Sequence, residues 1–248
     1  MFQSIGEMIV LGWRTFAALP QTLRQRRKVA EQLFEIGNAS LFMACLLSLF
    51  IGGVLALQSG PRLAERGISG LLGGLVGLSM AEELAPVMMS ILIAGRIGSA
   101  MAAEIGSMRV YQEIDALRTM NIDPVHYLVL PRMVAITLGL PLLVVFSMLV
   151  GWTGGALVAV FNRDIGITAA DYFSNLRMSV EGVDIFKGLF KSLVFGVMVG
   201  LVSCHQGLQT LGGPRGIGRS VTKAVVNSIV MILILDYCLT RFLLFLDR

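Results

Sequence analysis

Long apolar stretches without a charged side chain dominate the pattern of this chain. No Asp, Glu, Lys or Arg occurs between residues 36 and 61, between 133 and 162, or between 192 and 214. A helix needs about 20 apolar residues to cross roughly 30 Å of hydrocarbon, and each of these runs is longer. The runs therefore predict transmembrane helices.

Two further apolar regions contain acidic residues. Residues 67–95 are interrupted only by Glu82 and Glu83, and residues 221–246 contain Asp236. Ionisable groups inside a span are costly and usually face a cavity or a partner charge. With these regions as the second and fifth spans, we predict an all-α polytopic membrane protein with five transmembrane helices.

Composition narrows the class of protein. Of 248 residues, 55% are hydrophobic and 15% charged, whereas soluble domains carry about 25% charged residues. This excludes a soluble enzyme, a disordered chain and a disulfide-stapled secreted domain. Cys45, Cys204 and Cys238 lie in apolar runs, and the two histidines share no ligand spacing with them. We therefore expect no metal site and no catalytic residues.

The N-terminal residues have a helical amphipathic pattern. One face would carry Phe2, Ile5, Met8, Ile9, Trp13 and Phe16, and the other Gln3, Ser4, Glu7, Arg14 and Thr15. Leu11 is the exception. The pattern predicts a helix in the membrane interface; a helix packed on a partner or on the protein itself is the alternative. We expect Pro20 to end this helix.

A basic cluster precedes the first span and indicates the orientation. It consists of Arg24, Arg26, Arg27 and Lys28. Such clusters stay in the cytoplasm, so the N-terminus is predicted to be cytoplasmic. An odd number of spans then places the C-terminus on the outer, periplasmic side.

The segment between the second and third spans is a candidate for partner binding. Ala94, Gly98 and Ala102 form a small-residue face suited to close helix packing. Met108–Met120 is predicted to be one helix with an apolar stripe of Val110, Ile114 and Leu117. Such a helix can dock in a partner's groove, although a merely solvated helix fits the spacing equally well.

Other segments give more limited expectations. Residues 162–187 should contain a short amphipathic helix, and Gly73, Gly74 and Gly77 should let two copies approach closely. Residues 212–220 should form a tight cytoplasmic turn. Lys187 and Lys191 open the fourth span, and Lys191 is the candidate partner of Glu83. The alternative to a functional role for these charges, including Asp236, is a structural ion pair.

At the level of motifs, the chain resembles the MlaE/YrbE family, the permease subunits of MCE-type ABC lipid transporters. The resemblance lies in Glu83-Leu84-Ala85-Pro86-Val87, Ala94–Ala100, Ala103–Met108, Glu113-Ile114-Asp115-Ala116-Leu117, Gly216-Ile217-Gly218 and Leu235–Thr240. Glu82 departs from it, because family members often carry Arg there. The resemblance implies a permease domain at residues 31–248, after an interfacial helix and basic segment at residues 1–30.

The resemblance also implies partners and sites. Two copies would form the membrane core, with a cytoplasmic ABC ATPase that uses ATP and Mg, a periplasmic MCE-domain protein and a small STAS-type subunit; no nucleic acid is expected. The ATPase would dock on Glu113, Ile114, Asp115, Leu117 and Met120. A lipid cavity would be lined by Leu55, Leu57, Gln58, Leu63, Glu82, Glu83 and Leu84. Independently of the resemblance, the cost of charges inside a span assigns Lys191 and Asp236 as structural charges.

The function expected from this resemblance is ATP-driven phospholipid transfer between the bacterial inner membrane and a periplasmic MCE carrier, for outer-membrane lipid homeostasis. No cofactor is expected on this chain, which has no GxxxxGK[ST] motif for nucleotide. A proton-coupled secondary transporter, a non-transporting membrane anchor, and import of another hydrophobic lipid such as a sterol are the alternatives.

Overall fold

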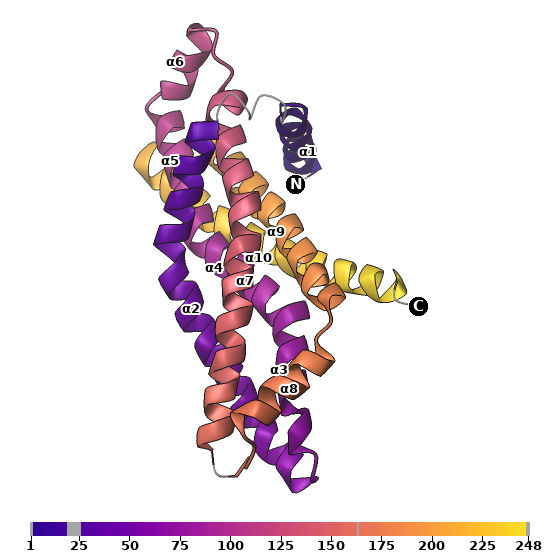
Figure 1. Ribbon diagram of the computed structural model, residues 1–248. Coiled ribbons are helices and arrows are strands. Elements are labelled where there is room, and N and C mark those ends of the chain that lie inside the picture. The colour runs from indigo at the N-terminus through magenta and orange to yellow at the C-terminus, as the bar shows by residue number, and fades with distance from the viewer. Residues whose placement is uncertain (1, 19–25, 163, 247–248) are drawn as a thin grey trace. The chain divides into compact units, whose positions relative to one another are not determined.

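The computed structural model describes residues 2–18, 26–162 and 164–246, and within these ranges it contains helices and no strand (Figure 1). The α-helices are α1 (Phe2–Ala17), α2 (Arg26–Glu65), α3 (Leu72–Ser79), α4 (Ala85–Ile93), α5 (Ser99–Val110), α6 (Glu113–Thr119), α7 (Leu130–Phe161), α8 (Ala169–Ser179), α9 (Gly182–Leu208) and α10 (Gly213–Leu246). A 3₁₀ turn precedes α3 at Ser69–Leu71, and π-helical segments occupy Met80–Leu84, Ala94–Gly98 and Val125–Val129.

The predicted apolar regions are confirmed as long helices. In the part of the chain that the structure describes, five helices are long and apolar enough to cross a membrane: Arg26–Glu65, Ser69–Val110, Val125–Phe161, Gly182–Leu208 and Gly213–Phe245. The second span is not a regular α-helix throughout, because two of the π-helical segments interrupt it.

The chain divides into two compact units, and four of the spans contribute to both. The first unit consists of Met1–Ala39, Ser90–Leu140 and Leu193–Arg248, and the second of Ser40–Met89 and Pro141–Ser192. The boundary between the units falls inside α2, the second span, α7 and α9.

In the second unit, α2 and α7 pack backbone against backbone. A Cβ on Gly52 would collide with the carbonyl oxygen of Gly151, and one on Gly154 with that of Leu49. The hydroxyls of Ser48 and Ser147 form a 2.6 Å hydrogen bond in the same buried contact. This glycine-rich part of the third span therefore packs closely against α2.

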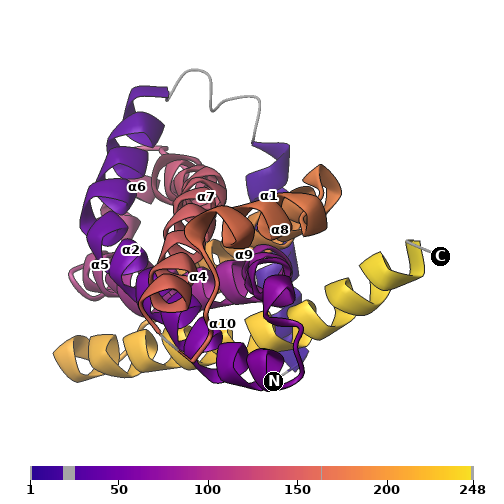
Figure 2. The same cartoon turned by 60° about the horizontal axis from the view of Figure 1, so that its bottom comes forward.

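The predicted short helix after the third span is α8, which lies against α3 (Figures 1 and 2). Thr168 caps it by accepting a hydrogen bond from the backbone N–H of Asp171. A Cβ on Gly73 would collide with the carbonyl oxygen of Tyr172, and Asn175 accepts the N–H of Gly74 at 2.7 Å. The expectation that these glycines join two copies is wrong, because the chain's own α8 occupies that face.

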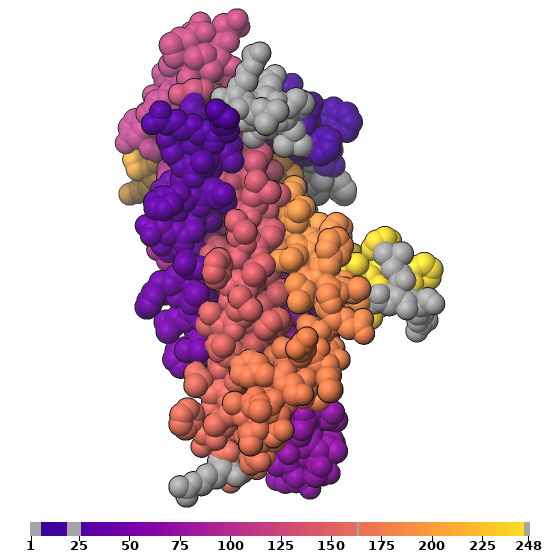
Figure 3. Space-filling view, viewed as in Figure 1, coloured from indigo at the N-terminus to yellow at the C-terminus, as the bar shows by residue number. Residues whose placement is uncertain are grey.

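Tyr172 joins α8 to the end of α7. Its side chain is fully buried, and its hydroxyl lies where a Cβ on Gly155 would otherwise be. Burial raises the pKa of the Tyr172 hydroxyl, because the charged form loses its hydration. The space-filling view shows α8 and the adjoining end of α7 as one continuous surface (Figure 3).

In the first unit, α1 has a buried side as well as an exposed apolar side. Ile9, Trp13 and Phe16 are exposed by 64%, 74% and 69%, as expected for a helix that meets lipid. Leu11 and Thr15 are buried on the opposite side, which explains why Leu11 departs from the simple amphipathic pattern. Pro20 and Arg24, named above for the helix end and the basic cluster, lie outside the described residues; Arg26, Arg27 and Lys28 belong to α2.

The prediction of one helix over Met108–Met120 is wrong. α5 ends at Val110, Gln112 takes a left-handed conformation with φ of 61°, and α6 begins at Glu113. An ion pair of 2.7 Å between Arg109 Nη1 and Asp115 Oδ1 spans the corner. The stripe of Val110, Ile114 and Leu117 is thereby divided between two helices.

The predicted turn over residues 212–220 is also shorter than expected. Gly212 and Gly213 have positive φ values of 89° and 70°, and the chain is helical from Gly213 onwards. The resulting α10 buries Ala224, Ser228 and Ile232, four residues apart, against its own unit. From Leu233 to Phe245 none of its residues is buried.

Candidate functional site

A break in the second span brings two glutamates to the candidate site. The helix changes to π-helical geometry over Met80–Leu84 and is α-helical again from Ala85. Pro86 follows directly, and it has no N–H group to donate to the carbonyl of Glu82, four residues earlier. π-helical turns of this kind occur frequently at functional sites.

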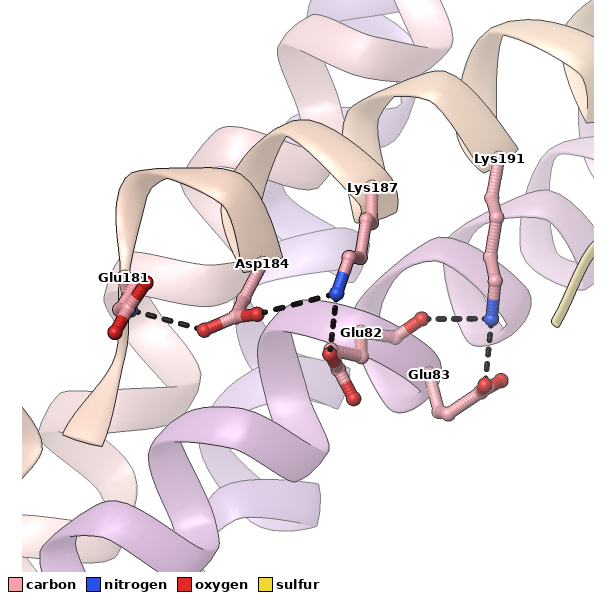
Figure 4. A network of polar contacts seen from close by, with 6 residues as sticks. All are labelled: Glu82, Glu83, Glu181, Asp184, Lys187 and Lys191. Atoms are coloured by element: carbon pink, nitrogen blue, oxygen red, sulfur yellow. Dashed lines mark hydrogen bonds and ion pairs between the residues drawn. The ribbon is translucent and has the colours of Figure 1, made fainter. Parts of the chain in front are cut away.

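Lys191 of α9 compensates for the missing donor. Its Nζ donates to the carbonyl oxygen of Glu82 at 3.0 Å and to Oε1 of Glu83 at 2.5 Å (Figure 4). The lysine side chain is 2% exposed, whereas that of Glu83 is 39% exposed. The predicted pairing of Lys191 with Glu83 is confirmed, and the backbone contact to Glu82 comes in addition.

Gly188 lets α9 come close enough for this contact. A Cβ at position 188 would collide with the carbonyl oxygen of Ala81 and would lie 3.0 Å from the Cε of Met148. Because Gly188 lies one helical turn before Lys191, the close approach places the ammonium beside the carbonyl of Glu82. A larger residue would move the lysine away.

A second, looser set of charges adjoins the first. Lys187 Nζ lies 3.8 Å from Glu82 Oε1 and 3.7 Å from Asp184 Oδ1, and Asp184 Oδ2 accepts the backbone N–H of Glu181 at 2.9 Å (Figure 4). Lys187 and Asp184 are 15% and 14% exposed at their side chains, while Glu82 is 39% exposed. The two glutamates are thus the more accessible members of the network.

The chemistry of the network is electrostatic. Glu82, Glu83 and Asp184 face Lys187 and Lys191, so one carboxylate exceeds the number of ammonium groups when all are ionised. The members hold charge and polar groups in place within an apolar span, and none of them is a hydroxyl or thiol nucleophile. Among the described residues, no cluster of three or more His, Cys, Asp and Glu could hold a metal ion.

Comparison with known proteins gives the family. The model of the family described as permease MlaE matches residues 29–242. A probable ABC transporter permease protein of Rickettsia felis is 36% identical over 239 residues, which cover 96% of this chain and 92% of that protein. This chain belongs to the MlaE permease family.

Two further relatives come from other groups of organisms. A probable ABC transporter permease protein of Synechocystis is 38% identical over 243 residues, covering 96% of this chain and 90% of that protein. The chloroplastic protein trigalactosyldiacylglycerol 1 of Arabidopsis thaliana is 37% identical over 216 residues, covering 87% of this chain and 61% of that protein. This MlaE permease is therefore a multi-pass membrane protein and a transport subunit of the ABC permease type.

The other residues predicted for a lipid cavity lie in the same unit as the network. Leu57 and Gln58 are exposed on α2, on the side away from Gly52 and Ala56, which face the core. Leu55 and Leu63 on α2 and Leu84 in the π-helical segment are half-buried. Of the seven predicted residues, the contacts described above join only Glu82 and Glu83, through Lys191.

The residues predicted to bind the ATPase lie on or next to α6, but they are not equally accessible. Ile114 is completely buried, whereas Glu113 and Asp115 are exposed, and Leu117 is half-buried. Met120, which follows the helix, is 61% exposed. The face available to a partner is therefore formed by Glu113, Leu117 and Met120, and Ile114 holds α6 on its own unit.

Sequence reasoning named Asp236 but did not name Gly188. Asp236, predicted as a structural charge, is half-buried in the exposed second half of α10. Gly188 was not singled out, although it decides how closely α9 approaches the Met80–Leu84 segment. The available signal was its place between Lys187 and Lys191, together with Pro86 four residues after Glu82.

Proposed function

We propose that this MlaE permease is the membrane subunit of an ATP-driven transporter that moves phospholipid between the bacterial inner membrane and a periplasmic MCE-domain carrier. The observation that carries the proposal is the match of nearly the whole chain to ABC permeases. The name of the Arabidopsis relative contains that of a glycolipid, which supports a lipid as cargo. In bacteria, the transfer would serve outer-membrane lipid homeostasis.

The energy would come from a separate subunit. The sequence contains no nucleotide-binding GxxxxGK[ST] motif, and ATP with Mg would be bound by a cytoplasmic ABC ATPase. The exposed face of Glu113, Leu117 and Met120 is the proposed docking surface, which places α6 in the cytoplasm. The N-terminus would then also be cytoplasmic and the C-terminus periplasmic.

The cargo would pass through a cavity between two copies of the chain. Leu57 and Gln58 of α2 point away from the chain's own core, as residues that line such a cavity would. The exposed half of α10 is a further apolar surface for a second copy or for lipid. An MCE-domain protein would receive lipid on the periplasmic side, and a small STAS-type subunit would accompany the ATPase.

Glu83 would have a mechanical role in this cycle. Its ion pair ties the π-helical segment to α9, and its half-exposed carboxylate can follow a change in its surroundings. We propose that Glu83 supports the wall of the lipid cavity and responds to its opening and closing. Acid–base chemistry is not required, because the transported lipid is not chemically changed.

Affinity purification of the full chain from its native membrane tests the proposal directly. Mass spectrometry should find an ABC ATPase, an MCE-domain protein and phospholipid in stoichiometric amounts with the permease. Co-purification without an ATPase, or with no lipid, would contradict the proposed function.

The Leu117→Arg variant tests the docking surface. A charged side chain in the centre of an apolar contact loses the packing energy and remains poorly solvated, so the ATPase should be lost from the complex. Met178→Arg on α8 is the matched control, because Met178 is 81% exposed and lies outside the proposed surface. Retention of the ATPase by Leu117→Arg would show that α6 is not the docking site.

A further inference from the structure

The first unit contains two cavities that are lined by residues of α1 and α9. The first is also lined by α7, and the second by α6 and residues 121–125. The first cavity has a volume of about 340 Å³, and most of its lining is apolar. The lining includes Phe16 from α1, Leu138 from α7, and Val197 and Leu201 from α9. This volume lies within the range of small-molecule binding sites. The cavity belongs to α1 as much as to the two spans, so it exists only while α1 stays in place.

The first cavity offers hydrocarbon and no polar partner. Its two hydroxyls are already satisfied inside their own helices: Thr15 donates to the carbonyl of Leu11 at 2.8 Å, and Thr137 to that of Met133 at 2.7 Å. Water needs several polar partners to occupy a cavity of this kind. An apolar chain is the occupant that the lining favours.

The second cavity is polar, and it shares α1 and α9 with the first cavity. Its volume is about 360 Å³, and its lining includes Arg14, Arg118, Asn121 and Asp123. Arg14 is the neighbour of Thr15, and Leu208 at this cavity lies seven residues after Leu201, which is about 10 Å along an α-helix. The second cavity therefore lies beside the same stretch of α1 as the first and further along α9.

The charge of the second cavity suits an anion. The Asp123 carboxylate is already engaged, because Oδ1 accepts the N–H of Val125 at 2.9 Å and Oδ2 lies 3.6 Å from His126 Nε2. Arg118 lies 3.5 Å from Asp115, which is itself held by Arg109 at 2.7 Å. The guanidinium groups of Arg14 and Arg118 thus supply the positive charge that a phosphate would contact.

We propose that these cavities form one binding site for an anionic phospholipid of the bilayer. Its phosphate lies at Arg14 and Arg118, and an acyl chain enters the apolar cavity under Phe16. The rim residues Phe16, Leu138 and Val197 are 69%, 49% and 36% exposed, so the cavity opens to the lipid that surrounds a membrane protein. The site goes beyond the proposed transport cavity, whose residues belong to α2 and to Met80–Leu84 in the other unit.

The site is tested with the full chain and its co-purified partners in nanodiscs. The probe is phosphatidylglycerol with a photoreactive group in one acyl chain, in a background of phosphatidylcholine. Mass spectrometry should map the cross-links to the cavity residues of α7 and α9. Val197→Trp fills the apolar cavity and should abolish these cross-links, and Leu138→Trp replaces it if that variant does not fold. Val226→Trp is the control, since Val226 is 52% exposed on α10 and lines neither cavity.

The arginines are tested separately. Arg14→Gln with Arg118→Gln should reduce the labelling by phosphatidylglycerol roughly tenfold, to the level of a phosphatidylcholine probe. Arg27→Gln is the control, because the Arg27 side chain is 91% exposed and pairs only with Glu31 in its own helix among the ion pairs described. Equal labelling of all exposed helices, or labelling that neither the tryptophan nor the arginine variants change, would overturn the proposal.

Discussion

The two π-helical interruptions of the second span are stabilised in different ways. At Ala94–Gly98 the hydroxyl of Ser99 lies 2.6 Å from the carbonyl oxygen of Gly95 and 2.9 Å from that of Arg96, so it donates to a carbonyl of its own helix. At Met80–Leu84 the carbonyl of Glu82 depends on Lys191, which is more than 100 residues away in the sequence. The polar contact at the first interruption comes from the same helix, whereas the contact at the second comes from α9.

The difference teaches which interruption can respond to movement. Displacement of the start of α9 would leave the carbonyl of Glu82 and the carboxylate of Glu83 without Lys191, at a considerable cost inside an apolar span. The same displacement would not change the bonds made by Ser99. The interruption at Met80–Leu84, which carries charge and depends on a distant residue, is therefore the one suited to couple helix motion to the proposed lipid cavity.

The largest effect is expected for Lys191→Met. The change leaves a carbonyl and a carboxylate without their donor, and such losses cost about 3–5 kcal/mol in buried pairs. Because Glu83 is 39% exposed, we expect the lower end, about 3 kcal/mol. The melting temperature of the purified protein should fall by roughly 6–12 °C. Lys187→Met is the control, since its ionic contacts are 3.7 and 3.8 Å long; equal effects of both changes would contradict the assigned role.

Gly188→Ala should have the next largest effect. The added methyl would collide with the Ala81 carbonyl, and overpacking of this kind costs about 1–3 kcal/mol. α9 has a matched control in Gly182→Ala, because a Cβ at that position meets nothing within 4 Å. Thermal unfolding of both variants should show a loss only for position 188. Unchanged stability of Gly188→Ala would mean that α9 does not need its close approach.

A smaller effect is expected for Ser99→Ala, which tests the locally satisfied interruption. Its hydroxyl bonds are worth about 0.5–1.5 kcal/mol in total, so the melting temperature should fall by a few degrees. Lipid transfer should be retained, because this interruption does not depend on α9. A loss of transfer without a loss of stability would remove the proposed distinction between the two interruptions.

The smallest effect on stability is expected for Glu83→Gln, together with a marked effect on function. The amide keeps the shape of the side chain and can still accept a hydrogen bond from Lys191. The free energy of unfolding should therefore change by about 1 kcal/mol or less. Lipid transfer between proteoliposomes and the carrier should fall, with dimer formation and ATPase docking intact. Full transfer activity would exclude the charge from the mechanism, and failure to fold would favour a purely structural ion pair.

The long-range architecture could be predicted because hydrocarbon imposes a simple rule. A charge-free run that is long enough to cross the bilayer has few alternatives to a helix. The ion pair of Glu83 with Lys191 could be predicted because an isolated charge inside a span is costly. The signal in each case was a strong energetic penalty that is visible in residue type alone.

Local corners and glycine partners could not be predicted in the same way. Gln112 is neither Gly nor Asn, so nothing in its residue type indicates the left-handed corner that separates α5 from α6. The sequence indicated a close contact at Gly73, Gly74 and Gly77, but it did not indicate which segment makes that contact. In the structure, α8 of the same chain makes it. A small residue indicates proximity, whereas the identity of the neighbour depends on the whole fold.

The contact of α2 with α7 limits the degrees of freedom of the second unit. Where the backbones touch at Gly52, Gly151 and Gly154, rotation of either helix about its axis would bring a side chain into a space that holds only hydrogen. The pair can tilt or translate as one piece, but its members cannot turn independently. Any cycle of opening and closing must therefore be carried by relative movement elsewhere in this unit, and α2 and α7 provide its fixed frame of reference.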